Sequence, residues 1–182
     1  LEKEIARLDS RRETLYESRG TGALRVLLKA GLDGIHGPVA QLAEVDDYHR
    51  LAIEVAAGSR IGQIVVDNDK IAATAISLLK KQKAGRLTFL PLNKIKNLAN
   101  KSNTFSKAID INTKGLIGKA VDLIKFEPIY CGVFSYIFGD TLVFQDLNSA
   151  RMQLGLNRSV TLGGELLEKS GAMTGGSFSR NN

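Results

Sequence analysis

The sequence contains no tryptophan, two histidines and a single cysteine among its 182 residues. A lone cysteine, Cys131, cannot form a disulfide within the chain, which indicates an intracellular protein. No apolar run approaches the roughly 18 residues that a membrane-spanning helix needs, so we expect no membrane segment and a cytoplasmic location. Aromatic residues make up only 6% of the chain, and no aromatic platform for stacking bases is evident.

Groups that carry enzyme chemistry are equally scarce. His36 and His49 lie in unrelated contexts, and Cys131 is surrounded by apolar residues. No spacing predicts a catalytic triad or a metal site. Residues 115–120 resemble a phosphate-binding loop, but the first glycine is misplaced and Ala120 stands where Ser or Thr would hold Mg²⁺. We therefore predict no enzyme activity, cofactor or metal for this chain.

Residues 1–19 carry a heptad pattern with charged flanking positions, and Gly20 and Gly22 end it. One interpretation is an amphipathic helix that packs on its own domain. We favour the end of a longer coiled-coil arm, because the apolar stripe is narrow and the chain starts inside the pattern without a methionine. The seam positions are Leu1, Ile5, Leu8, Arg12 and Leu15.

Helix and strand patterns alternate from residue 22 to residue 92. An apolar helical stripe over 45–57, with Val45, Tyr48, Ala52 and Val55 on one face, precedes a short strand at 63–66. Residues 67–69 offer an N-cap to a second helix, and a second strand follows at 86–90. This alternation predicts an α/β (mixed α+β) fold.

The pattern returns after a polar linker at 93–114, in which we expect a helical piece around 95–99. An internal duplication of this kind predicts two pseudo-symmetric subdomains, 22–92 and 115–177, with 178–182 as the return to the coiled coil. Because complementary halves can also meet between chains, two such contacts would close a dimeric ring. The matched segments are 34–42 with 115–123, Gly58 with Gly139, and 64–67 with 143–146.

Positive charge is concentrated in parts of the chain. The net charge is +6, and residues 92–126 carry seven lysines against two aspartates. A second basic cluster at 80–86 could instead complement a helix dipole or aid solubility. Without base-reading motifs, any contact with DNA should be to phosphates and independent of sequence. The predicted DNA-binding residues are Lys80, Lys81, Lys94, Lys96, Lys101 and Lys107.

Residues 161–176, TLGGELLEKSGAMTGG, resemble the glycine-rich signature that closes the hinge of SMC (structural maintenance of chromosomes) proteins. Residues 31–48 resemble the opening of that hinge and 85–92 its central strand. Gly163 departs from the family, which commonly has Asp there, and this puts a polar contact from that position in doubt. The resemblance covers residues 22–177.

The resemblance implies a dimerisation hinge that joins two coiled-coil arms and contributes DNA binding. It implies a prokaryotic homodimer on the nucleoid, with the returning arm of the same protein as a further partner and ATPase heads that lie outside this chain. Glycines also permit turns with positive φ and close backbone approach at an interface. The predicted interface residues are Gly163, Gly164, Gly171, Gly175 and Gly176.

Two alternatives to the hinge remain open at this point. A small α/β enzyme or ligand-binding domain could cradle an anion in its glycine-rich loops, and it would need a pocket with convergent ionisable residues. A nucleic-acid-binding module could act as a monomer. The mass in solution separates the monomeric module from the dimeric hinge.

Overall fold

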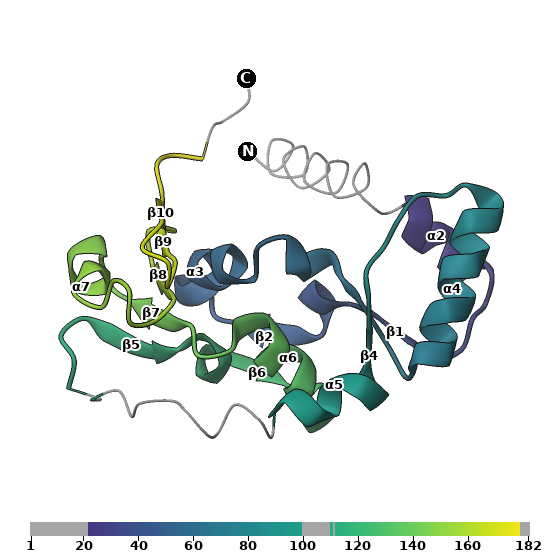
Figure 1. Cartoon of the computed structure of the whole chain (residues 1–182), viewed down its shortest axis with the longest axis horizontal. Coiled ribbons are helices and arrows are strands. Elements are labelled where there is room, and N and C mark those ends of the chain that lie inside the picture. Colours follow the sequence, from purple (N-terminus) through teal and green to yellow (C-terminus); the bar gives the residue numbers. More distant parts are fainter. Residues whose placement is uncertain (1–21, 100–109, 111, 179–182) are drawn as a thin grey trace, which may run out of the picture. The chain divides into compact units, whose positions relative to one another are not determined.

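The computed structural model describes residues 22–99, 110 and 112–178 (Figure 1). The predicted coiled-coil residues 1–19, together with Lys101, Lys107 and 179–182, lie outside the described residues. The described residues fall into two compact units, one within Leu1–Pro38 and Gly62–Lys94 and the other within Val39–Ile61 and Ile95–Asn182. Among the described residues, no helix has the length and apolar character required to cross a bilayer.

The first unit is a three-stranded sheet with two helices packed together. The strand order is β1-β3-β4, with β1 antiparallel and β4 parallel to the central β3. Helix α2 packs on α4 through a core of Ala23, Leu27, Ala75 and Leu79. The elements are α2 (Gly22–Lys29), β1 (Ile35–Pro38), β3 (Ile64–Val66), α4 (Asp69–Gln82), β4 (Phe89–Pro91) and the start of α5 (Leu92–Ala99).

Helix α4 begins where the sequence places its cap. The side chain of Asn68 accepts a hydrogen bond from the backbone N–H of Ile71 at 2.9 Å, which satisfies one of the unpaired donors of the first turn. Asp69, in the same turn of α4, accepts a hydrogen bond at Oδ1 from Asn93 Nδ2 of α5 at 2.9 Å. This hydrogen bond from Asn93 is the main cause that lowers the pKa of Asp69.

The second unit is built around a five-stranded sheet of order β10-β9-β8-β7-β5, with β2 and β6 paired separately. Helix α3 packs against β8 and α6. The elements are η2 (Val39–Gln41), β2 (Ala43–Val45), α3 (Asp47–Ala57), η3 (Gly58–Gly62), β5 (Leu116–Lys119), η5 (Ala120–Leu123), β6 (Ile124–Phe126), η6 (Pro128–Tyr130), α6 (Cys131–Phe138), β7 (Leu142–Phe144), α7 (Leu147–Arg151), β8 (Ser159–Thr161), β9 (Leu166–Leu167) and β10 (Met173–Thr174).

The two sheets repeat the same pairing, which supports the predicted duplication. Strand β5 is antiparallel to β7 with an irregularity between Leu116 and Gly118, as β1 is to β3 between Ile35 and Gly37. Strand β8 is parallel to β7, as β4 is to β3. The following helices are capped by Asn68 and Asp146. Hydrogen bonds from Ser149 lower the pKa of Asp146.

These caps correct the sequence alignment by one residue. Matching 64–67 with 143–146 paired Asp67 with Asp146, whereas the structure gives the capping role of Asp146 to Asn68 in the first repeat. Asp67 instead pairs with His36 Nε2 at 2.5 Å. Three consecutive residues could each have capped the helix, so the local sequence did not determine which one does.

Packing divides the chain differently from the sequence repeat. Residues 39–61 belong to the first repeat, but β2 pairs with β6 of the second repeat and α3 contacts β8 and α6. The subdomain boundaries 22–92 and 115–177 therefore follow the repeat and not the compact units. The helical piece expected around 95–99 of the polar linker is confirmed, since α5 extends to Ala99.

The predicted buried face of the helix at 45–57 is wrong in part. Val45 lies in β2, and Tyr48 is 67% exposed. The residues that α3 buries are Ala52, Ile53, Ala56 and Ala57. The helix begins only at Asp47, and contacts with both β8 and α6 select a different face from the one suggested by periodicity.

We predict that Asn68→Ala lowers the free energy of unfolding by about 1 kcal/mol, because the N–H of Ile71 loses its acceptor. Asn68→Ser is the matched control, since serine also caps a helix N-terminus. Urea denaturation measures both variants. Equal losses in the two variants would mean that the cap is not what Asn68 contributes.

Candidate dimer interface

The glycine-rich segment, defined as residues 161–178, continues the sheet of the second unit beyond β8. Strand β9 pairs antiparallel with β8, and β10 pairs antiparallel with β9. The turn between β8 and β9 is closed by a hydrogen bond from the N–H of Gly164 to the carbonyl of Thr161 at 3.0 Å. The segment thus forms the last hairpin of the sheet (Figure 1).

Gly171 serves the turn of this hairpin. The N–H of Gly171 donates to the carbonyl of Glu168 at 3.0 Å, and the N–H of Glu168 donates to the carbonyl of Ala172 at 2.8 Å. Gly171 has φ of 99°, the left-handed conformation that this three-residue hairpin loop requires. A Cβ there would meet nothing within 4 Å, so its φ is the reason for this glycine.

Strand β10 has a free edge. Within the described residues, β9 is the only strand that pairs with it. Because the N–H of Glu168 donates to Ala172, the alternation of an antiparallel ladder directs the N–H and carbonyl of Met173 away from β9. Met173 is also 47% exposed. Such an edge can accept another strand.

An exposed apolar patch lies beside this hairpin and consists of Tyr48, Leu51 and Phe178. A Cβ on Gly164 would be 3.3 Å from both Leu51 Cδ2 and Phe178 Cε2, so these two side chains flank the glycine. Tyr48 is three residues before Leu51 on α3, which places them on neighbouring helix positions. Tyr48, Leu51 and Phe178 are 67%, 37% and 65% exposed. Exposed apolar groups gathered in this way are typical of protein contacts.

The other predicted glycines lie in the same segment. Gly176 has φ of 131° and open space around its Cβ position. Gly163 and Gly175 both face the side chain of Glu165. The structure therefore gathers the five glycines on one hairpin and its flanks. The sequence predicted the segment, but it gave no indication that Leu51 of α3 lies beside Gly164.

The described lysines predicted to bind DNA lie on two helices. Lys80 and Lys81 occupy the last turn of α4, and Lys94 lies in the first turn of α5. Lys96 belongs to α5, and its side chain is not among those that the structure describes. Arg25 and Lys29, which the sequence prediction did not include, lie on α2, and α2 packs on α4. The described first unit carries eight basic residues against three acidic ones: Arg25, Lys29, Lys70, Lys80, Lys81, Lys83, Arg86 and Lys94 against Asp33, Asp67 and Asp69.

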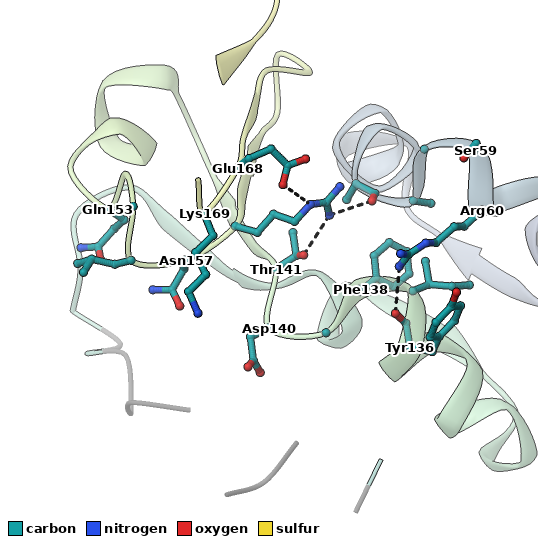
Figure 2. Close-up of a pocket in the computed structure, with 18 of the residues that line it drawn as sticks. Ser59, Arg60, Tyr136, Phe138, Asp140, Thr141, Gln153, Asn157, Glu168 and Lys169 are labelled. Atoms are coloured by element: carbon teal, nitrogen blue, oxygen red, sulfur yellow. Dashed lines mark hydrogen bonds and ion pairs between the residues drawn. The ribbon is translucent and has the colours of Figure 1, made fainter. Parts of the chain in front are cut away.

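A polar cavity of about 1170 Å³ in the second unit lies at the ends of α3 and α6 (Figure 2). Arg158 Nη1 donates to the carbonyl of Ala56 at 3.0 Å and to Thr141 Oγ1 at 3.1 Å, and its Nε lies 3.3 Å from Glu168 Oε2. Positive charge at a helix C-terminus is favourable, so Arg158 stabilises the end of α3.

Arg60 binds the C-terminal end of α6 as Arg158 binds that of α3. Its Nη1 donates to the carbonyl of Tyr136 at 3.3 Å, and its guanidinium lies 4.8 Å from the centroid of the Tyr136 ring. Two charged groups of the cavity, Arg158 and Glu168, pair with each other. This arrangement fits helix capping better than the catalytic pocket of the enzyme alternative. The described residues contain no group of three or more His, Cys, Asp or Glu placed to hold a metal.

In the described residues these features define an α/β domain with a repeated half, an unpaired sheet edge at β10 and an exposed apolar patch at the β8–β9 turn, which are features typical of a protein-contact module. The chain belongs to the SMC hinge family, because residues 32–153 match the family model described as SMC proteins Flexible Hinge Domain.

Curated relatives agree with this assignment. The chain is 47% identical over 176 residues to the chromosome partition protein Smc of Gloeobacter violaceus, covering 97% of this chain and 14% of that protein. It is 42% identical over 167 residues to Smc of Pyrococcus furiosus, covering 91% of this chain and 13% of that protein. The chain thus spans only a small part of these relatives.

Solved structures share the fold. The Pyrococcus furiosus SMC hinge domain superposes with a TM-score of 0.73 at 40% identity, covering 93% of this chain and 87% of that chain. An asymmetric dimer of the Geobacillus stearothermophilus SMC hinge domain gives a TM-score of 0.75 at 30% identity, covering 98% and 75%. The mixed α/β fold expected from the sequence is confirmed by these likenesses.

We predict that Gly164→Ala lowers the free energy of unfolding more than Gly155→Ala does, by about 1 kcal/mol. Both glycines have nearly the same φ, 88° and 87°, so the backbone strain is matched. Only at Gly164 does the added methyl group press on Leu51 and Phe178, since Gly155 has nothing within 4 Å. Urea denaturation compares the two, and equal losses would assign Gly164 to backbone conformation alone.

Proposed function

We propose that this chain is the dimerisation hinge of an SMC chromosome partition protein. The observation that carries the proposal is the hairpin of β9 and β10: within the described residues β10 pairs with no strand other than β9, and the exposed side chains of Leu51 and Phe178 flank Gly164 before β9. A hinge relative at 30% identity is described as a dimer, which supports the same assembly here. Sedimentation at micromolar concentration tests the proposal, and a wild-type chain that stays monomeric well above that range contradicts it.

The partner is a second copy of the chain, and its first unit offers a matching edge. Strand β8 is followed by β9 and β10, but in the described residues no strand extends the sheet beyond β4. Strands β4 and β8 occupy corresponding places in the two sheets. We expect β10 of one copy to lie along β4 of the other, and two such contacts close a two-fold ring.

The hinge works without catalysis of its own. It joins the two coiled-coil arms of a longer protein, whose ATPase heads lie outside this chain. Such a protein partitions chromosomes in the cytoplasm and associates with the nucleoid. The names of the two relatives described above, both chromosome partition proteins, at 47% and 42% identity, support this wider role.

A second function is sequence-independent DNA binding by the basic residues of the first unit. The excess of eight basic over three acidic residues, and the packing of α2 on α4, support it. Lys80 and Lys81 both lie in the last turn of α4 and Lys83 directly follows the helix, so several cations gather at one helix end. Phosphate contacts of this kind release counterions and depend steeply on salt.

We predict that Met173→Lys raises the dimer dissociation constant by about tenfold or more, because a charge on an edge strand opposes pairing with another strand. Met152→Lys is the matched control, since Met152 is also exposed, at 78%, but lies in the loop after α7. Sedimentation gives both constants. A dimer that tolerates Met173→Lys places the interface away from β10.

We predict that Lys80→Glu with Lys81→Glu weakens binding to unrelated DNA sequences alike and lowers the slope of log K against log salt by about two. Arg151→Glu is the control, because Arg151 also lies in the last turn of its helix, α7. Fluorescence anisotropy at several salt concentrations measures the slopes. Unchanged binding in the double variant would show that these lysines only complement the helix dipole.

A further inference from the structure

Gly163 and Gly175 flank one side chain. An ideal Cβ on Gly163 would lie 2.8 Å from Glu165 Oε2, and one on Gly175 would lie 3.0 Å from Glu165 Cγ. Neither glycine has a positive φ, so their backbone conformation is open to other residues. What these two positions lack is space, because the side chain of Glu165 occupies it.

Glu165 is bound to the end of β8 through both its backbone and its side chain. The Thr161 hydroxyl donates to Glu165 Oε2 and accepts from the N–H of Glu165 at 3.2 Å. The N–H of Thr161 also donates to the carbonyl of Glu165 at 3.0 Å. Thr161 is fully buried, so its hydroxyl is a fixed point in the sheet.

The side chain of Glu165 therefore connects three parts of the hairpin. It contacts the Gly163–Gly164 turn before β9, its carboxylate reaches the buried end of β8, and its methylene groups lie against Gly175 after β10. The three atoms nearest to an ideal Cβ on Gly175 all belong to Glu165. The contact fixes the direction in which the chain leaves β10.

We propose that Glu165 is a positioning residue for dimerisation: it holds β10 and the backbone at Gly175 in the arrangement that a second copy of this chain recognises. This inference rests on the proposed function as a dimerisation hinge. It also gives Gly163 and Gly175 a role within the chain, which is to make room for Glu165. Gly164 and Gly171 differ from them because positive φ determines those positions.

The test is a double-mutant cycle on the whole chain with Gly175→Ala and Glu165→Ala. Each single variant should raise the dimer dissociation constant by at least about tenfold, the first by displacing Glu165 Cγ and the second by removing the contact with Thr161. The double variant should dissociate no more easily than Glu165→Ala alone. The nearest remaining atom of residue 165 would be Cβ at 3.6 Å, an ordinary contact. Additive losses would mean that Gly175 faces the partner directly and would overturn the proposal.

Conservative variants separate positioning from general stability. Glu165→Gln keeps the side-chain length and an oxygen acceptor for Thr161, so the dissociation constant should stay within about threefold of wild type. Thr161→Val keeps the shape but removes the hydroxyl, so it should weaken the dimer as Glu165→Ala does. Sedimentation gives the dissociation constants, and circular dichroism reports folding of the dissociated chain.

The outcomes distinguish this inference from the proposed function. A wild-type chain without a dimer contradicts the hinge assignment itself. A wild-type dimer whose dissociation constant is unchanged in Glu165→Ala, or in Thr161→Val if Glu165→Ala does not fold, overturns the role of Glu165 alone. A lower unfolding midpoint with an unchanged dissociation constant also overturns it, since that result describes a purely structural contact.

Discussion

Burial of the short strand β8 constrains the rest of the second unit. Ser159, Val160 and Thr161 are all completely buried, although two of them carry hydroxyl groups. The Thr161 hydroxyl has a hydrogen-bond partner in Glu165, whereas the buried Oγ of Ser159 has none in the part of the chain that the structure describes. Directly before the strand, Arg158 donates to the carbonyl of Ala56 and pairs with Glu168. Both ends of β8 therefore attach the glycine-rich segment to the core.

The same strand explains why the two sequence repeats do not fold as two separate bodies. Helix α3 comes from the first repeat but packs on β8 of the second, and β2 pairs with β6. Arg158, directly before β8, caps the last turn of that helix. Because residues 39–61 pack on the second repeat, they cover apolar surface that this repeat would expose by itself. Cutting the chain in the linker would consequently leave each half without part of its core.

Local signals were predictable from the sequence, and signals that depend on distant residues were not. The cap region at 67–69 and the strand at Ile64–Val66 follow from neighbouring residues alone. The exposure of Tyr48 does not, because contacts with β8 and α6 decide which face of α3 is buried. Arg25 and Lys29 belong to the same packed pair of helices as Lys80 and Lys81 only because α2 packs on α4, which is distant from it in sequence.

The glycine-rich segment shows where sequence information ends. Its location is readable as a cluster of glycines, yet the five residues differ in physical role. Gly171 closes a hairpin turn, Gly164 combines positive φ with contacts to Leu51 and Phe178, and Gly175 leaves space for Glu165. Spacing alone cannot distinguish these roles, because one depends on φ and the others on atoms from different elements. The proposed interface, which uses the backbone of these glycines, therefore depends on neighbouring side chains, and in this hairpin the side chain of Glu165 lies against Gly163 and Gly175.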